Sequence, residues 1–164
     1  MKKLFISLLV ISLISCQPAM EQKVVDLNSL EKEIINNSKA FQLAYISNDY
    51  LEAKQFLSDE ITTTVFNSNG SSLLEQSEEQ ISNSGRGWEF IRFDMKNHQV
   101  FIAPDAKSIA VIFDTEGEIE FENTEEKVLY STRASQFWVS TSQGWKIMHS
   151  HWSPKEQAQG IPNE

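Results

Sequence analysis

The chain has 164 residues, of which 40% are hydrophobic and 23% charged, and its formal net charge is -9 at pH 7. This mix excludes a disordered or collagen-like chain, and the length suits one domain with its own core. The acidic balance argues against nucleic acid as a partner, because phosphate binding needs clustered Lys and Arg. The single cysteine excludes a disulfide framework and a cysteine-rich zinc site.

The first residues have the pattern of an export signal. Two lysines precede the apolar run Leu4–Ile14, which is too short for an ordinary transmembrane helix. The run ends in Leu13-Ile14-Ser15-Cys16, which resembles the lipobox of bacterial lipoproteins. The resemblance implies lipidation of Cys16 and export to the periplasmic or cell-surface face of a bacterial membrane, with the lipid as the only membrane contact. A plain secretory signal with an incidental cysteine is the alternative. We expect a lipoprotein signal peptide over 1–15 and a tether over 16–27.

Helical periodicity dominates the chain after this segment. Apolar residues recur at helical spacing from position 27 to position 45, so one face of the helix is apolar. Asn28 followed by Glu31 suits a capping box at its start. Asn48-Asp49 ends the helix, and Asp49 can cap a second helix that continues through Leu57.

After Gly87 the hydrophobic period changes to two, which is typical of half-buried strands. Helices followed by hairpin-linked strands predict an α+β domain with an antiparallel sheet, and the polar residues 154–164 are expected to form a loose tail. Before the change we expect a strand over Ile61–Phe66 and a short helix over Leu73–Ile81. After it we expect strands over Trp88–Met95 (continuing to Ile102 through a bulge near Asn97), Ser108–Phe113, Ile119–Phe121, Lys127–Thr141 and Trp145–Trp152, with Trp145 in the core.

The closing residues carry a resemblance to a known family. They read Arg133-Ala134-Ser135-Gln136-Phe137-Trp138 and then Gly144-Trp145-Lys146-Ile147-Met148-His149-Ser150-His151-Trp152-Ser153. This pattern resembles the C-terminal signature of SnoaL-like/DUF4440-type domains of the nuclear transport factor 2-like superfamily. It is also similar to the association (hub) domain of calcium/calmodulin-dependent protein kinases. The similarity covers most of residues 28–153.

The resemblance implies a cone-shaped fold. A curved antiparallel sheet wraps around a long N-terminal helix and leaves a pocket at the open end. Family members commonly dimerise through the sheet, which implies a homodimer here. Some are isomerases, cyclases or dehydratases, so the fold does not settle the function.

Arg133 is an isolated cation in a strand that is otherwise apolar or small. It could hold a carboxylate in the pocket, or form a structural ion pair with Glu118 or Glu120 on the neighbouring strand. We predict that its guanidinium and a histidine ring converge on one cavity, bordered by the first helix at Phe41 or Tyr45, and orient a ligand there.

His149 and His151 are two residues apart, so a regular strand would place both on one face with Trp145 and Ile147. Either could be a general acid or base, because the unperturbed pKa of histidine is near neutral. Alternatively, the pair hydrogen-bonds at the sheet or lies on the dimer face. A zinc site would need His98 or a carboxylate as a further ligand, and two ligands are a weak signal, so we predict no metal.

Asp94 and Asp114 each lie in or beside an apolar strand. A ketosteroid-isomerase-like mechanism uses a carboxylate base in an apolar pocket, so either could be catalytic, and Asp94 could also complete a metal site. The alternative is a pair of carboxylates that face water. The aromatic residues among the candidates could equally be plain core. Besides Arg133, His149 and His151, the residues expected to bind a ligand are Trp152, Tyr45, Phe41, Trp88, Phe113 and Gln136.

The comparison with the hub domain bears on the ligand. The hub pocket holds small carboxylates with arginines, and Phe113, Gln136 and Trp152 stand at the matching positions here. The resemblance therefore implies a more apolar ligand, or none.

Three functional hypotheses follow. The leading one is a membrane-anchored lipoprotein whose SnoaL-like domain, 28–153, binds a small, partly apolar molecule without a cofactor. The second is an isomerase, cyclase or dehydratase that uses a His or Asp base in the same pocket. The third is a dimeric interaction module with a vestigial pocket, which a cone closed by Trp88 and Trp152 would favour.

Overall fold

The structure is a computed structural model that describes residues 26–82, 87–122, 124 and 126–162. The predicted signal peptide, the lipidation site Cys16 and most of the tether lie outside the described residues. The helices are α1 (Leu27–Ile46), α2 (Tyr50–Lys54) and α3 (Glu78–Ile81). The strands are β1 (Thr64–Phe66), β2 (Leu74–Glu75), β3 (Trp88–Ile102), β4 (Ser108–Phe121), β5 (Lys127–Thr141) and β6 (Gly144–Pro154). Within the described ranges, no helix has the length and apolar character needed to cross a membrane.

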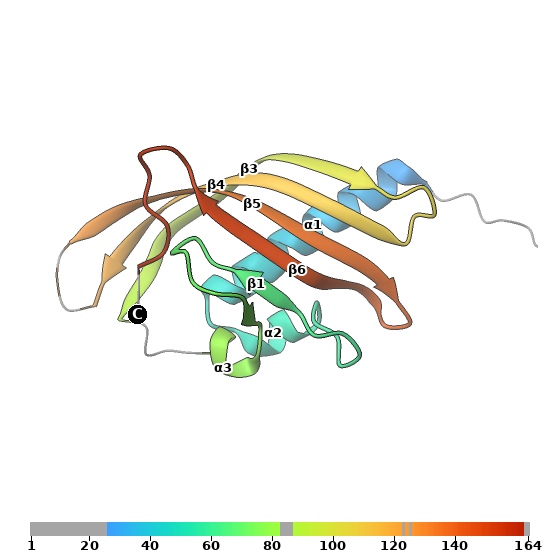
Figure 1. Cartoon of the computed structure of the whole chain (residues 1–164), viewed down its shortest axis with the longest axis horizontal. Coiled ribbons are helices and arrows are strands. Elements are labelled where there is room, and N and C mark those ends of the chain that lie inside the picture. The colour runs from blue at the N-terminus through green and yellow to red at the C-terminus, as the bar shows by residue number, and fades with distance from the viewer. Residues whose placement is uncertain (1–25, 83–86, 123, 125, 163–164) are drawn as a thin grey trace, which may run out of the picture.

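The strands form one curved, open sheet with the order β2-β1-β6-β5-β4-β3. All neighbouring strands are antiparallel except β1 and β6, which run parallel. The long helix α1 lies along one face of the sheet, which we call the inner face; the opposite face is the outer face (Figure 1). This arrangement confirms the predicted α+β fold class.

Local capping explains where the first two helices begin. The Asp26 carboxylate accepts hydrogen bonds from two backbone N–H groups at the start of α1, so Asp26 rather than Asn28 is the capping residue. Asp49 caps α2 in the predicted way, by accepting a hydrogen bond of 3.1 Å from the backbone N–H of Glu52. α2 is shorter than predicted and ends at Lys54.

The long strands follow the predicted boundaries closely. β3 continues to Ile102 through a register shift between Lys96 and Gln99, and Asn97 there has a φ of +55°, so the predicted bulge is confirmed. The two strands predicted over 108–121 are one continuous strand, β4. The segment Leu73–Ile81, predicted as one helix, divides into β2 and α3.

The last residues pack against the domain instead of forming the expected loose tail. The backbone N–H of Lys155 donates to the carbonyl of Ser131 at 3.0 Å, and the N–H of Ser131 donates to the carbonyl of Gln159 at 3.4 Å. Gly160 and Pro162 are buried. We call residues 155–162 the C-terminal strap; they loop back from the end of β6 towards the start of β3 (Figure 1).

The core lies between α1 and the inner face. Its largest fully buried side chains are Trp138, Phe41 and Phe113. A second cluster forms around Trp88, Ile119 and Tyr130, and the strap residue Ile161 packs against it. Trp145, predicted to be core, is only partly buried and packs on the border of the main cluster.

Candidate functional site

Alternating burial along β5 defines the two faces of the sheet. Ala134, Gln136 and Trp138 are buried on the inner face, whereas Arg133 and Phe137 are exposed on the outer face. Cross-strand partners lie on the same face of the sheet, so the alternation along β5 also shows which residues of the neighbouring strands face inward and which face outward.

A bulge in β6 reverses the facing predicted for its last residues. Trp138 pairs with Ile147, but the preceding residue Phe137 pairs with His149, so Met148 is an extra residue in β6. Beyond Met148 the residues that a regular strand would turn inward therefore lie on the outer face.

The predicted pocket residues are consequently divided between the two sides of the sheet. The cavity predicted from Arg133, a histidine of β6 and the first helix does not form, because the sheet separates them. The inner side carries Tyr45, Phe41, Trp88, Phe113, Gln136 and Trp152. The outer side carries Arg133, His149, His151, Asp94 and Asp114.

Aromatic side chains fill the interior of the cone. The ring of Phe56 lies 6.2 Å from that of Phe41 and 6.0 Å from that of Trp138, edge-on in both cases. Phe113 and Trp152 make a further edge-on contact at 5.5 Å. The hub-like position Phe113 therefore belongs to the core.

A small cavity lies at the open end of the cone, which we call the cone mouth. Its volume of about 20 Å³ has room for about one water molecule. Trp88 and Trp152, whose burial the third hypothesis requires, are only 5% and 7% exposed. The residues around the cavity include Gln42, Ser68, Gln76, Tyr130, Trp152 and Ile161.

Several polar groups inside the cone have no hydrogen-bond partner in the described part of the chain. Gln136 Oε1 accepts hydrogen bonds from Ser38 Oγ at 2.6 Å and from Trp138 Nε1 at 3.3 Å, but Gln136 Nε2 has none. Ser150 Oγ, on the residue paired with Gln136 across the strands, is also without a partner, as is Gln76 Oε1 at the cone mouth. Such buried groups call for a water or a ligand.

Tyr130 is a buried titratable group at the cone mouth. Burial raises the pKa of its hydroxyl, although hydrogen bonds with Thr132, Ser68 and Thr115 act in the opposite direction. The neutral phenol accepts a hydrogen bond of 3.2 Å from Thr132 Oγ1. A phenol with a raised pKa is a hydrogen-bonding group at neutral pH and not a base.

The two aspartates proposed as bases face outward. Asn97 Nδ2 donates to the Asp114 carboxylate at 2.8 Å, and Lys155 lies 3.2 Å from it. The hydrogen bond from Asn97, together with Lys155 and Arg133, holds the pKa of Asp114 below its ordinary value, so the carboxylate is ionised. Asp94 forms an ion pair with Arg92 on the exposed surface.

Arg133 also lacks the neighbours proposed for it. It lies directly across from Asp114, and within the described residues no ion pair joins it to either candidate glutamate of β4. Its guanidinium is solvent-exposed, so the strand does not need a ligand to offset its desolvation.

The three histidines do not form one site. His98 stacks on Phe113 at 5.5 Å, towards the inner face, and burial followed by the charge of Lys39 lowers its pKa. His149 lies on the outer face, where Nδ1 is 2.9 Å from Thr64 Oγ1. Burial, and then the charge of His151, lowers the pKa of His149. The described residues contain no group of three His, Cys, Asp or Glu side chains close enough to hold a metal ion.

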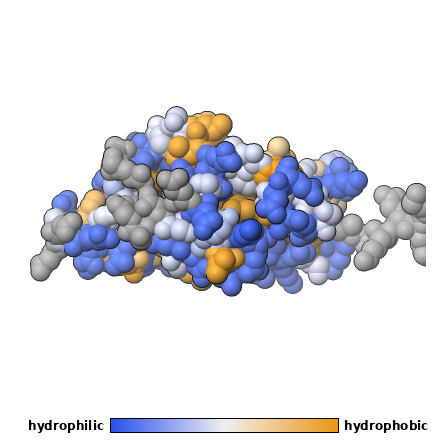
Figure 2. Space-filling view, turned by 90° about the horizontal axis from the view of Figure 1, so that it is seen from below, coloured by the Kyte–Doolittle hydropathy of each residue, from blue (hydrophilic) through white to orange (hydrophobic). Residues whose placement is uncertain are grey.

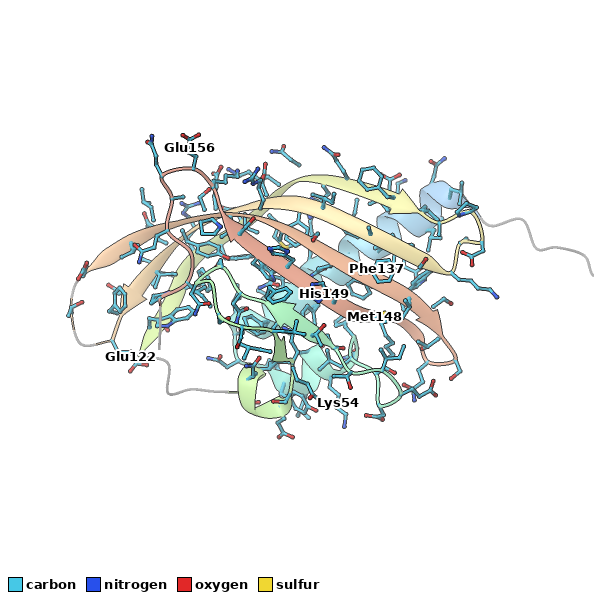
Figure 3. The ribbon with its side chains drawn as sticks, viewed as in Figure 1. Lys54, Glu122, Phe137, Met148, His149 and Glu156 are labelled. Atoms are coloured by element: carbon cyan, nitrogen blue, oxygen red, sulfur yellow. The ribbon has the colours of Figure 1, made fainter. Side chains whose placement is uncertain are left out.

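The outer face carries an apolar surface that we call the outer patch. Phe137 and Met148, labelled with His149 in Figure 3, lie near the middle of the sheet. Phe66 makes ring contacts with His149 at 5.7 Å and with His151 at 5.8 Å. The members of the outer patch are Phe66, Phe101, Ile112, Phe137 and Met148, which are 39–54% exposed.

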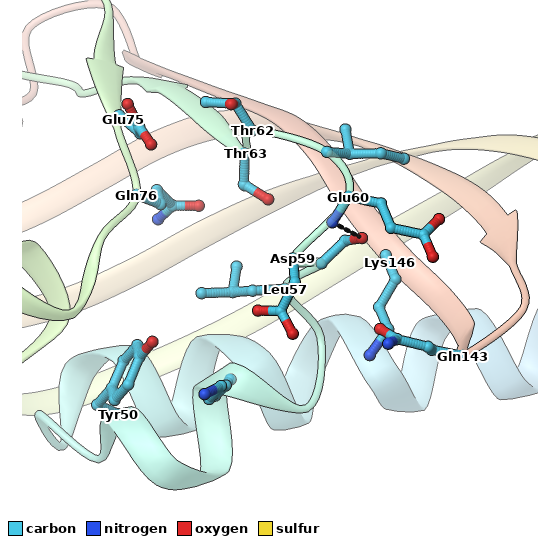
Figure 4. Close-up of a pocket in the computed structure, with 13 residues that line it drawn as sticks. Tyr50, Leu57, Asp59, Glu60, Thr62, Thr63, Glu75, Gln76, Gln143 and Lys146 are labelled. Carbon is cyan, nitrogen blue, oxygen red and sulfur yellow. Dashed lines mark hydrogen bonds between the residues drawn. The ribbon is translucent and has the colours of Figure 1, made fainter.

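A polar cleft of about 340 Å³ opens between α2, the following loop and the start of β6 (Figure 4). Asp59 and Glu75 bring carboxylates to it, while the buried Lys146 donates to the carbonyl of Gln55 at 2.7 Å. No spacing motif joins these residues, so the sequence alone does not predict the cleft. From the side of α2 and α3 the surface is mostly hydrophilic, with scattered hydrophobic clusters (Figure 2). The mixed charges do not select one kind of ligand.

No protein family and no curated protein matches the chain by sequence. Solved structures do match its fold. One is a nuclear transport factor 2-like superfamily protein from Salmonella enterica, with a TM-score of 0.64, 18% identity, and coverage of 84% of this chain and 99% of that one. The association domain of C. elegans CaMKII matches with a TM-score of 0.61 and 17% identity, and the match covers 77% of this chain and 96% of that one. A ketosteroid isomerase-like protein from Erwinia carotovora atroseptica matches with a TM-score of 0.61 and 13% identity, and the match covers 83% of this chain and 99% of that one. The chain therefore has the nuclear transport factor 2-like fold, as predicted.

Proposed function

We propose that this nuclear transport factor 2-like domain is an association module that pairs with a second copy of itself through the outer face of its sheet. The predicted lipid on Cys16 would hold the pair at a bacterial membrane. The observation that carries the proposal is the outer patch: large apolar side chains are exposed on a sheet whose other face is already covered.

Strand pairing places members of the outer patch in two neighbouring rows across the sheet. Phe101 of β3, Ala110 of β4 and Phe137 of β5 are cross-strand partners in one row. The next row contains Ile112 of β4. This row crosses β5 and β6 and ends at Phe66 of β1. Several large apolar side chains exposed on one face of a sheet mark an interaction site.

Charged pairs border the outer patch along β3 and β4. Lys96 contacts Glu116 at 2.6 Å, and Lys155 contacts Asp114 at 3.2 Å. An apolar centre with a charged rim is the usual anatomy of a protein interface. A two-fold axis through the patch would place the same surface on both subunits, which is the commonest symmetry of soluble oligomers.

The inner face favours this proposal over catalysis. The cavity at the cone mouth has room for about one water, and Asp114 lies on the opposite face of the sheet. Asp94 borders a separate pocket of about 250 Å³ between α1 and β3, where it is held in an ion pair with Arg92. His98 is the histidine on that side, and its ring is packed flat against Phe113. A general base needs access to a bound substrate, and the cavity at the cone mouth is too small to hold one. The name of the C. elegans structure, an association domain, supports the same reading.

Oligomeric state tests the proposal directly. Phe137→Asp places a charge in the middle of the outer patch, and Leu43→Asp introduces the same charge on α1, where Leu43 is 63% exposed. Both are made in the mature chain with Cys16→Ser, so that lipid does not drive association. We expect a dimer in sedimentation equilibrium, weakened about 30-fold or more by Phe137→Asp, since a central aromatic contributes roughly 2 kcal/mol or more. Leu43→Asp should associate like the parent. A monomeric parent at micromolar concentration, or equal loss in both variants, would refute the proposal.

Small-molecule binding inside the cone is a second candidate. The observation that favours it is the presence of buried polar atoms without a partner, Gln136 Nε2, Ser150 Oγ and Gln76 Oε1, on the inner side of the sheet. Of these atoms, Gln76 Oε1 lines the cavity at the cone mouth, where a molecule with an apolar body and a hydrogen-bonding group would satisfy it. Native mass spectrometry of freshly purified protein tests this, because a retained small molecule adds a discrete mass. A single apo mass under gentle conditions would count against it.

A further inference from the structure

The C-terminal strap closes the cone mouth from outside. The backbone N–H of Ile161 donates to Ser68 Oγ at 3.0 Å, and Gln159 forms a bridge with Tyr130. The side chain of Ile161 lines the remaining cavity together with Tyr130 and Trp152, and it packs against the cluster around Tyr130. The strap therefore occupies the position through which a molecule would reach the cone.

Gly160 makes this closure possible. A Cβ atom at this position would lie 2.1 Å from the carbonyl oxygen of Ser68 and 2.8 Å from its Cβ. Real Cβ atoms do not approach backbone atoms so closely, so the strap or the Ser68 loop would have to move. The strap sits in its groove only because residue 160 has no side chain.

The strap is held more weakly than the strands it covers. Its backbone pairing with β5 is limited to the bonds at Lys155 and Gln159, the second of them long at 3.4 Å. Gln157 has a φ of +63°, an unfavourable conformation for a residue with a side chain. The ion pair between Lys155 and Asp114 is partly exposed to solvent and adds little. Limited backbone pairing and an unfavourable backbone conformation are properties of a segment that opens locally.

We propose that the strap is a displaceable plug in a binding site at the cone mouth, and that its release opens this site to a small molecule with an apolar body and one hydrogen-bonding group. The apolar body would take the place of Ile161 between Tyr130 and Trp152. The amides of Gln42 and Gln76 would meet the polar group. This inference rests on the second candidate function and is independent of dimer formation.

Full-length variants of the mature chain with Cys16→Ser test the proposal. Gly160→Val forces the strap out of its groove, and Ile161→Ser removes the apolar plug without a clash. The matched control is Glu156→Val, which places the same valine at an exposed strap position. Hydrogen exchange at the Ser131 and Ile161 amides reports whether the strap has left, and thermal melting reports whether the domain is folded. The probe is 1-anilinonaphthalene-8-sulfonate, which has an apolar body and one anionic group.

We expect fast hydrogen exchange at both amides in Gly160→Val. The probe should bind this variant at least about tenfold more tightly than Glu156→Val. The reason is that a site open in one molecule in ten or fewer binds with an apparent affinity reduced by at least that factor. A synthetic peptide of residues 155–162 should displace the probe from Gly160→Val, and the same peptide with valine in place of its glycine should not. Displacement of the probe by the peptide distinguishes binding at the cone mouth from binding at the outer patch, because the outer patch is unchanged in every variant.

Two results would overturn the proposal at different steps. Unchanged exchange in a folded Gly160→Val variant would show that the strap is not displaceable. Fast exchange without peptide-sensitive probe binding would show that the strap covers no ligand site, and the second candidate function would fall with it. Neither result bears on the dimer, which the Phe137→Asp experiment tests separately.

Discussion

Two tryptophans near the turn between β5 and β6 differ in burial, and we predict that they differ sharply in their contribution to stability. Trp138 has no exposed surface, contacts Phe56 edge-on at 6.0 Å, and donates from Nε1 to Gln136 Oε1. Trp145, on the same face, is only partly buried. The substitutions Trp138→Ala and Trp145→Ala therefore compare the same chemical change in two environments.

The magnitude for Trp138 follows from its burial. A buried indole removes about 150–250 Å² from water, which at about 25 cal/mol per Å² corresponds to roughly 4–6 kcal/mol. Measured losses for Trp→Ala in cores are about 3–5 kcal/mol, because the surroundings relax. The loss of the hydrogen bond to Gln136 adds about 1 kcal/mol. We expect about 4–5 kcal/mol for Trp138→Ala, and about half of that for Trp145→Ala.

Urea unfolding followed by circular dichroism measures both values, provided that the slope with denaturant is unchanged. The free energy of unfolding of a domain of this size is about 5–15 kcal/mol in total, so Trp138→Ala can abolish folding. Trp138→Phe retains an aromatic ring and gives a smaller, measurable loss in that case. If Trp145→Ala costs as much as Trp138→Ala, the smaller contribution that we assign to the partly buried Trp145 is refuted.

Three further outcomes follow from the sequence and the structure. Cys16→Ser should move the protein from the membrane fraction to the soluble fraction, and unchanged detergent partitioning would contradict lipidation. Gly117→Ala should destabilise the domain by about 1–3 kcal/mol, because its Cβ would lie 2.4 Å from the Arg92 carbonyl oxygen; a melting temperature equal to that of the parent would show that β3 yields easily. Stability should fall as the pH drops through the ordinary histidine value of 6.5, because burial lowers the folded-state pKa of His98 and His149, so the unfolded chain binds more protons. His149→Gln should flatten the dependence of melting temperature on pH between about 5 and 8, and an unchanged slope would show that His149 titrates alike in both states.

Local rules in the sequence determined most of the elements. The cap at Asp49 depends on neighbouring residues alone, and the structure has it. The bulge near Asn97 was also predicted, although it is completed by pairing with the neighbouring strand β4. The change of hydrophobic period after Gly87 likewise predicted the long strands, because alternation follows from the geometry of a single strand. The fold class followed from the order of these elements together with the resemblance.

The facing of the candidate site residues depended on contacts between distant parts of the chain. The N–H of Ile147 donates to the carbonyl of Phe56 at 2.9 Å, and the Ile147 carbonyl accepts from Thr63 Oγ1 at 2.7 Å. These bonds adjoin the bulge at Met148, which turns His149 outward.

The closure of the cone is also a tertiary property. The strap fits against Ser68, far from it in the sequence, because Gly160 leaves space for the backbone there. The sequence determined the hydrophobic alternation, and this alternation decided which residues of a regular strand share a face. Only the tertiary structure decided which face met α1, where that alternation broke, and what covered the cone mouth, because each depends on pairing between segments that the chain separates.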